Sequence, residues 1–102
     1  MMIDAKIIWV PPDEGGRRTI PPAGKYYAVA KFPEDIAWEA EAWSVVFELE
    51  PAIPEEMKIV SYAKVRFLVD TAPQERMKKN EGFEIYEGPK KVADVILRPP
   101  KK

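Results

Sequence analysis

Glu14-Gly15-Gly16-Arg17-Arg18-Thr19 lies between an apolar run, Ile3 to Val10, and a second run that begins near Tyr26. Two adjacent glycines after a strand mark backbone that needs a positive φ or a close approach to another segment. The two arginines that follow place fixed positive charge at the tip of a loop. This stretch therefore predicts a structured loop that leads out of a first β-strand.

Most of the chain alternates between apolar and polar side chains with a period of two, which is typical of half-buried strands. Prolines and glycines separate these runs, as they do in all-β barrels and sandwiches, and a barrel leaves no free strand edge. The sequence thus predicts an all-β fold, a barrel of about six antiparallel strands. The expected strands are residues 3–10, 26–32, 43–50, 59–69, 83–86 and 91–97.

Three details of this prediction can be checked. Pro51 and Pro54 bracket a stretch that we expect to be a turn, and Val69 should share the inner face of its strand with Phe67. Residues 72–80 are rich in helix formers and predict a loop with one helical turn. Residues 34–42 are ambiguous; we interpret them as a loop and then a strand approaching Trp43.

Composition limits the function. The 102 residues predict one domain, residues 1–98, followed by a frayed basic tail, 99–102. Sixteen Lys and Arg face 17 Asp and Glu, which argues against a protein that coats nucleic acid. The absence of Cys and His excludes disulfides, thiol chemistry and Ser-His-Asp catalysis. We expect a cytoplasmic protein with no metal, no cofactor and no membrane contact, since neither a signal peptide nor a long apolar run is present.

A strand, Glu14-Gly15-Gly16-Arg17, Thr19, Pro21 and Gly24-Lys25-Tyr26 occur in this order near the N-terminus. Near the other end, Val65–Val69 is followed by Phe83–Gly88 and by Lys91-Val92-Ala93. Both arrangements resemble the C-terminal β-barrel domain of bacterial elongation factor Tu, over roughly residues 3–97. The resemblance implies a Greek-key barrel of the translation-factor type, present here as a stand-alone domain.

The chain departs from that family at several positions. Gly24-Lys25-Tyr26-Tyr27-Ala28 stands where the family has Gly-Tyr-Arg-Pro-Gln, Arg18 replaces a His, and Ala93-Asp94 replaces small residues. In the family, this domain contributes to binding the T-stem of aminoacyl-tRNA and packs against the nucleotide-binding domain. The chain has no phosphate-binding Gly-x-x-x-x-Gly-Lys-[Ser/Thr] motif, so we expect no nucleotide site.

The loop and the start of the next strand form the candidate binding site. Glycine N–H groups beside guanidinium groups can hold a phosphate or RNA, and an aromatic ring beside cations can stack on bases. The alternative is a structural turn pinned by an ion pair between Glu14 and one arginine, with the tyrosine in the core or at its rim. The candidate residues are Glu14, Gly15, Gly16, Arg17, Arg18, Lys25 and Tyr26.

Three weaker candidates remain. Arg76, Lys78 and Lys79 would form a basic patch with Lys90 and Lys91 if the two segments meet; otherwise they are solvated charges. Trp38 among Glu34, Asp35, Glu39 and Glu41 would suit a basic protein partner. Asp13 beside Glu14 could share a site in a carboxylate enzyme; otherwise the two are solvated loop carboxylates.

These observations favour a non-catalytic binding module whose partner is a protein that contacts the end carrying Gly15 to Arg18. The alternative is a module that binds tRNA or rRNA through the same loop. Salt separates the two, because phosphate contacts weaken steeply as salt rises. A small carboxylate enzyme is the third hypothesis.

Overall fold

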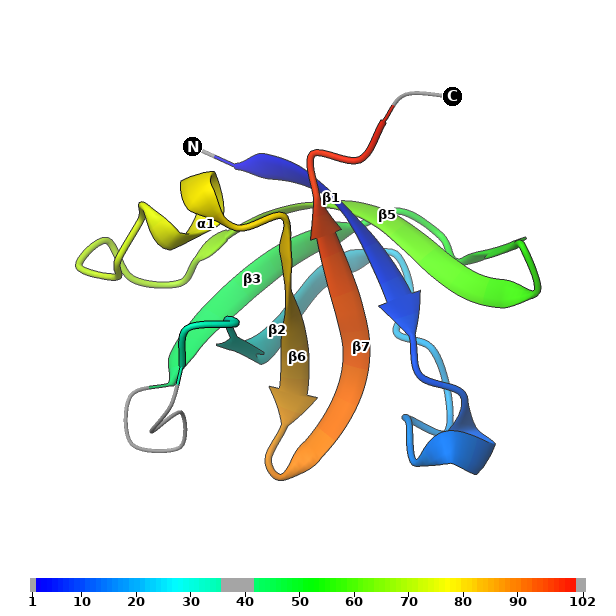
Figure 1. The fold of residues 1–102 in the computed structure, drawn as a ribbon. Coiled ribbons are helices and arrows are strands. Elements are labelled where there is room, and N and C mark those ends of the chain that lie inside the picture. The colour runs from blue at the N-terminus through cyan, green and yellow to red at the C-terminus, as the bar shows by residue number, and fades with distance from the viewer. Residues whose placement is uncertain (1, 36–41, 101–102) are drawn as a thin grey trace.

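The computed structural model describes residues 2–35 and 42–100, and these form one antiparallel sheet that closes on itself (Figure 1). Its strands are β1 (Ile3–Trp9), β2 (Gly24–Lys31), β3 (Trp43–Leu49), β4 (Ile53–Glu55), β5 (Lys58–Phe67), β6 (Gly82–Glu87) and β7 (Lys90–Leu97). The short helices are η1 (Pro12–Glu14) and α1 (Arg76–Lys79). Within the described residues, no helix has the length and apolar character needed to cross a membrane.

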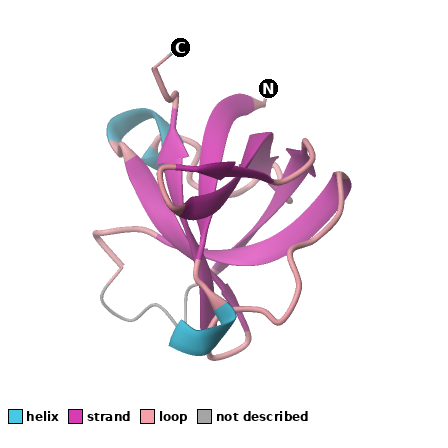
Figure 2. Cartoon of the chain, turned by 90° about the vertical axis from the view of Figure 1, so that its right-hand side faces the viewer, coloured by secondary structure: helices cyan, strands magenta, loops and turns pink. Residues whose placement is uncertain are grey.

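Six of the strands build a closed barrel in the order β1-β7-β6-β2-β3-β5, and pairing of β5 with β1 closes it. Strands β2, β3 and β5 are successive neighbours, and β6 returns to lie beside β2, which is a Greek-key connection. The predicted all-β barrel of six antiparallel strands is therefore confirmed. Figure 2 shows the barrel from the side, with both termini at the top.

The inward-facing rows of the strands fill the barrel. On β1, Ala5, Ile7 and Trp9 are all buried, as their alternation predicts. The Trp9 ring packs edge-on against Tyr26, with 5.5 Å between ring centroids. Its indole N–H donates to the Ser61 hydroxyl over 2.9 Å, so the core's buried serine has a partner.

Strand β4 lies outside the barrel and continues the line of β3 along β5 after a bulge. Leu49 pairs with Ala63 and Ile53 pairs with Val60, so the step from 49 to 53 on one strand spans only 63 to 60 on the other. One extra residue reverses the faces of the side chains that follow it. Strict alternation along a strand would place Ile53 on the same inward face as Leu49, four residues earlier. Because of the extra residue, Ile53 faces outward instead.

Two sequence predictions along this part of the chain were wrong. The turn expected around Pro54 is strand β4, and the chain turns instead at Glu56 and Met57. Proline is tolerated in β4 because this strand forms the edge of the sheet. Strand β5 ends at Phe67, and Val69, expected to face inward, is 44% exposed because the chain has already left the sheet.

The other local predictions fall differently. Helix α1 confirms the single helical turn expected within residues 72–80. Residues 36–41, for which we expected a loop leading into a strand, lie outside the described residues, and β3 begins at Trp43. Toward the C-terminus, the Arg98 N–H donates to the Asp4 carbonyl over 2.7 Å, so the chain is tied to β1 as far as residue 98.

Candidate functional site

The loop between β1 and β2 is a turn held by its own backbone. The N–H groups of Gly15 and Gly16 donate to the carbonyls of Pro12 and Pro11, over 3.2 and 3.0 Å. Gly15 has a φ of 94°, and a Cβ on Gly16 would lie 1.9 Å from the Val10 carbonyl oxygen. Both glycines are therefore required by the backbone, and their N–H groups already have acceptors within the loop.

Arg17 anchors this loop to the far end of the chain. Its guanidinium and the Tyr26 O–H both bond to the same carboxylate oxygen of Glu87, at the end of β6. The guanidinium also donates to the Thr19 carbonyl over 3.0 Å and lies 5.8 Å from the centre of the Tyr26 ring. We expected a possible ion pair between an arginine and Glu14, but Glu14 is exposed and Glu87 takes that place.

Tyr26 belongs to the core rather than to an open stacking surface. Its side chain is buried, and its ring packs between Trp9 and Phe47. Burial and the hydrogen bond to Glu87 both raise the pKa of the Tyr26 hydroxyl. Of the residues predicted for this site, only Glu14, Gly15, Arg18 and Lys25 are exposed in the folded chain.

The five basic residues of the second cluster do not meet. Helix α1 precedes β6 and the turn at Lys90 follows it, so the length of β6 separates the two segments (Figure 1). The basic residues of each segment form ion pairs with carboxylates close to them in space instead. Arg76 and Lys79 contact Glu34 at 3.9 and 3.3 Å, and Lys91 contacts Asp94 at 2.9 Å. The two segments therefore do not form a shared basic patch, and Arg76, Lys79 and Lys91 lie in separate ion pairs.

Of the candidate acidic surface around Trp38, the structure describes Glu34 and Asp35. Trp38 itself lies outside the described residues. Asp35, whose side chain is nearly buried, accepts a hydrogen bond of 2.5 Å from Arg76 on α1. Glu34 is engaged by the same helix, so these two carboxylates hold α1 against the end of β2.

A second feature lies at the end of the barrel that carries the β1–β2 loop. It is the hairpin formed by β4 and the first residues of β5. It projects beyond the barrel on the side where β1 ends, as the right-hand part of Figure 1 shows. Its two-residue turn consists of Glu56 and Met57, with φ angles of 51° and 70°. Such turns favour Asn-Gly, and a side chain in this left-handed region costs roughly 1–2 kcal/mol per residue. This turn is therefore strained.

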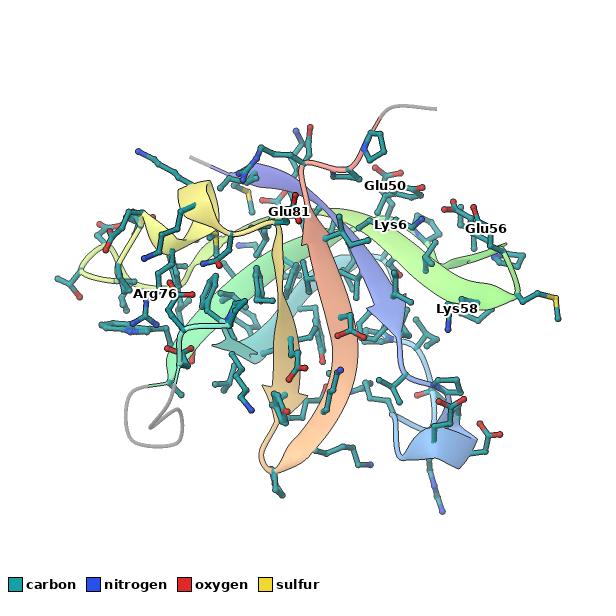
Figure 3. The ribbon with its side chains drawn as sticks, viewed as in Figure 1. Lys6, Glu50, Glu56, Lys58, Arg76 and Glu81 are labelled. Atoms are coloured by element: carbon teal, nitrogen blue, oxygen red, sulfur yellow. The ribbon has the colours of Figure 1, made fainter. Side chains whose placement is uncertain are left out.

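The hairpin exposes apolar side chains in every direction. Met57 is fully exposed, at 103%, and Ile53 and Ile59 are 42% and 43% exposed. Ile53 pairs with Val60 on the outer face, whereas Ile59 pairs with Pro54 on the opposite face. The sequence did not predict this site. The one signal in the sequence is an isolated methionine between two charged residues. These two residues, Glu56 and Lys58, are labelled at the tip of the hairpin in Figure 3.

A polar network fixes the base of this hairpin. The Lys6 ammonium on β1 pairs with the Glu55 carboxylate, and the Tyr62 O–H donates to the same carboxylate over 2.9 Å. The hydrogen bond to Glu55 raises the pKa of Lys6. Because the pair is mostly shielded from solvent, it ties β4 to β1 across β5. The apolar tip is thus presented on a rigid support.

The carboxylate pair named for a small enzyme, Asp13 and Glu14, lies on the short helix η1. Both residues are exposed. Within residues 2–35 and 42–100, no group of three acidic side chains is placed to hold a metal ion.

Comparison of the chain with models of protein families, with curated proteins and with solved structures found no match.

Proposed function

We propose that this chain is a non-catalytic protein-binding module that docks through the tip of its β4–β5 hairpin. The observation that carries the proposal is Met57, which is fully exposed in a turn where both residues have positive φ. Backbone strain of this kind clusters at functional sites. Glu56 and Met57 make the hairpin less stable than Asn-Gly would, so their side chains have a use outside folding.

The shape of the hairpin defines the kind of partner. Apolar groups at the tip and on both faces suit insertion into a concave apolar pocket, as an anchor side chain does in many interfaces. Addition of a partner strand to β4 is disfavoured, because β4 has three residues and one is Pro54. The support from Lys6 and Glu55 reduces the conformational entropy lost on docking.

Site-specific photo-cross-linking tests this proposal. A photoreactive amino acid placed at position 57 of the full chain should cross-link a discrete protein in cells. The matched control carries the same group at position 90, which is exposed in the β6–β7 turn. Equal cross-linking from the two positions would argue against the hairpin as the docking site.

Substitutions then measure the contribution of the tip with the purified partner. Met57→Asp should weaken binding by tenfold or more, about 1.4 kcal/mol or above, as expected for a buried anchor. Met57→Leu should retain binding, because it conserves apolar volume. Leu68→Asp is the control, since Leu68 is 43% exposed at the other end of β5. A loss of binding in Leu68→Asp alone would place the interface elsewhere.

RNA binding at the loop is the second candidate function, and one observation favours it. Arg18 and Lys25 are exposed, and neither takes part in an ion pair within the described residues. Titration with bulk tRNA at low and moderate salt tests this candidate, and absence of binding at low salt would exclude it. Arg18→Ala is the informative variant, because Arg17→Ala also disturbs Glu87 and Tyr26.

We further propose that the chain acts in the cytoplasm as a relative of the elongation factor Tu barrel. The support for this kinship is the sequence resemblance at both ends of the chain, from the loop at Gly15 to the strand at Val92. Small Greek-key barrels serve many functions, so kinship alone would not transfer tRNA binding to this chain.

A further inference from the structure

Methionine sulfur is the most readily oxidised group in this chain, because the sequence has four methionines and no cysteine. Among the residues that the structure describes, the methionines differ sharply in access to solvent. Met77 on α1 is 2% exposed and Met2 is partly buried, whereas Met57 is 103% exposed. Of the three methionines that the structure describes, Met57 is therefore the one whose sulfur is most accessible to a water-borne oxidant.

We infer that Met57 is an oxidation site at which conversion to the sulfoxide switches off docking by the hairpin. The inference rests on the proposed function for its effect on docking, but not for the site of oxidation. Met57 stands in the turn at the tip of the hairpin, and the two strands behind it expose Ile53 and Ile59. A polar S–O group at that point interrupts the only apolar surface that the tip presents.

The chemistry needs only hydrogen peroxide as the oxidant. A lone pair of the Met57 sulfur attacks one peroxide oxygen, so that an S–O bond forms as the O–O bond breaks. The sulfur loses two electrons to the peroxide, and the departing hydroxide takes the proton from the transferred oxygen and leaves as water. A thiol-dependent sulfoxide reductase reverses the step: the oxygen leaves as water and a dithiol becomes a disulfide.

The position of Met57 makes the modification compatible with the fold. Its side chain is fully exposed, so the sulfoxide displaces no packed group. Oxidation of Met77 would instead place a polar group in the core, at a cost to stability. Oxidation of Met57 therefore changes only the surface of the protein, whereas oxidation of Met77 would destabilise the fold.

Peptide mapping of the peroxide-treated full chain tests the site. Met57 should be oxidised about tenfold or more faster than Met77, with the melting temperature unchanged while one oxygen is taken up. Met57→Leu should lose this fast phase, and Met77→Leu should keep it. Oxidation of Met2 or Met77 at the same rate as Met57 would overturn the assignment.

Retention on a phenyl resin tests the change of surface without any partner. Wild-type chain should elute earlier after oxidation, near Met57→Gln, and return to its first position after treatment with the reductase. Met57→Leu should elute at the same place before and after peroxide. Unchanged retention of the oxidised wild type would overturn the surface switch.

Cross-linking from position 59 tests the effect on docking. The yield should fall about tenfold on oxidation and recover on reduction, because an unpaired polar group in an apolar pocket weakens binding by this order. Cross-linking that persists unchanged in the oxidised chain would overturn the switch while leaving the docking proposal intact. Absence of cross-links in the reduced chain would overturn both the docking proposal and the switch, but not the oxidation site.

Discussion

Replacing the strained turn by Asn-Gly, in the double variant E56N/M57G, should stabilise the protein. Glu56 and Met57 both occupy the left-handed region, at roughly 1–2 kcal/mol each. Asparagine tolerates this region and glycine has no penalty there, although glycine adds roughly 0.5–1 kcal/mol of unfolded-state entropy. The net gain should be about 1–2 kcal/mol, and each kcal/mol raises the melting temperature of a domain this size by roughly 4–8 °C.

Urea unfolding followed by tryptophan fluorescence measures this gain. The matched control is Gly88→Ala in the β6–β7 turn, where the glycine has a φ of 59° and a Cβ would meet no atom within 4 Å. Because the site is open, the variant should lose about 1 kcal/mol from backbone conformation alone. If E56N/M57G unfolds at the same or a lower urea concentration than wild type, the turn stores no strain and the argument for function loses its basis.

Three further predictions concern the loop end. Gly16→Ala should lower the free energy of unfolding by about 1–3 kcal/mol, because its Cβ would overlap the Val10 carbonyl; an unchanged urea midpoint would contradict this geometry. Arg17→Ala should cost about 1 kcal/mol, since its half-exposed pair with Glu87 is partly screened by solvent; a calorimetric melting temperature equal to that of wild type would show the anchor to be without effect. The raised pKa of Tyr26 favours its neutral form in the folded state, so stability should fall as the pH rises above about 10, the ordinary pKa of a tyrosine, and less steeply in Tyr26→Phe; equal slopes would refute the assignment.

The barrel was predictable because its strands carry their own periodicity. The alternation at Ala5, Ile7 and Trp9 is local information, and it assigns both the strand and its buried face. The double glycine likewise marks a backbone requirement that any residue with a Cβ would violate, as Gly16 shows. Such features follow from the residue and its immediate neighbours.

The hairpin could not be predicted from the sequence, because its residues depart from the usual preferences of strands and turns. Pro54 reads as a turn residue, yet it lies in an edge strand, and the true turn is Glu56-Met57, which lacks the usual asparagine and glycine. The anchor of Arg17 was hidden for another reason. Its partner Glu87 is brought near only by the closed barrel, and no spacing in the sequence relates the two.

The placement of β1 has a consequence for the order in which the protein is made. Ile7 pairs with Ser61 on one side and with Val95 on the other, so β1 is synthesised well before both of its neighbours. Contacts this distant in sequence make folding slow. During translation, the apolar row of β1 is not fully covered until β7 has left the ribosome. In that interval the nascent chain can aggregate or be bound by chaperones.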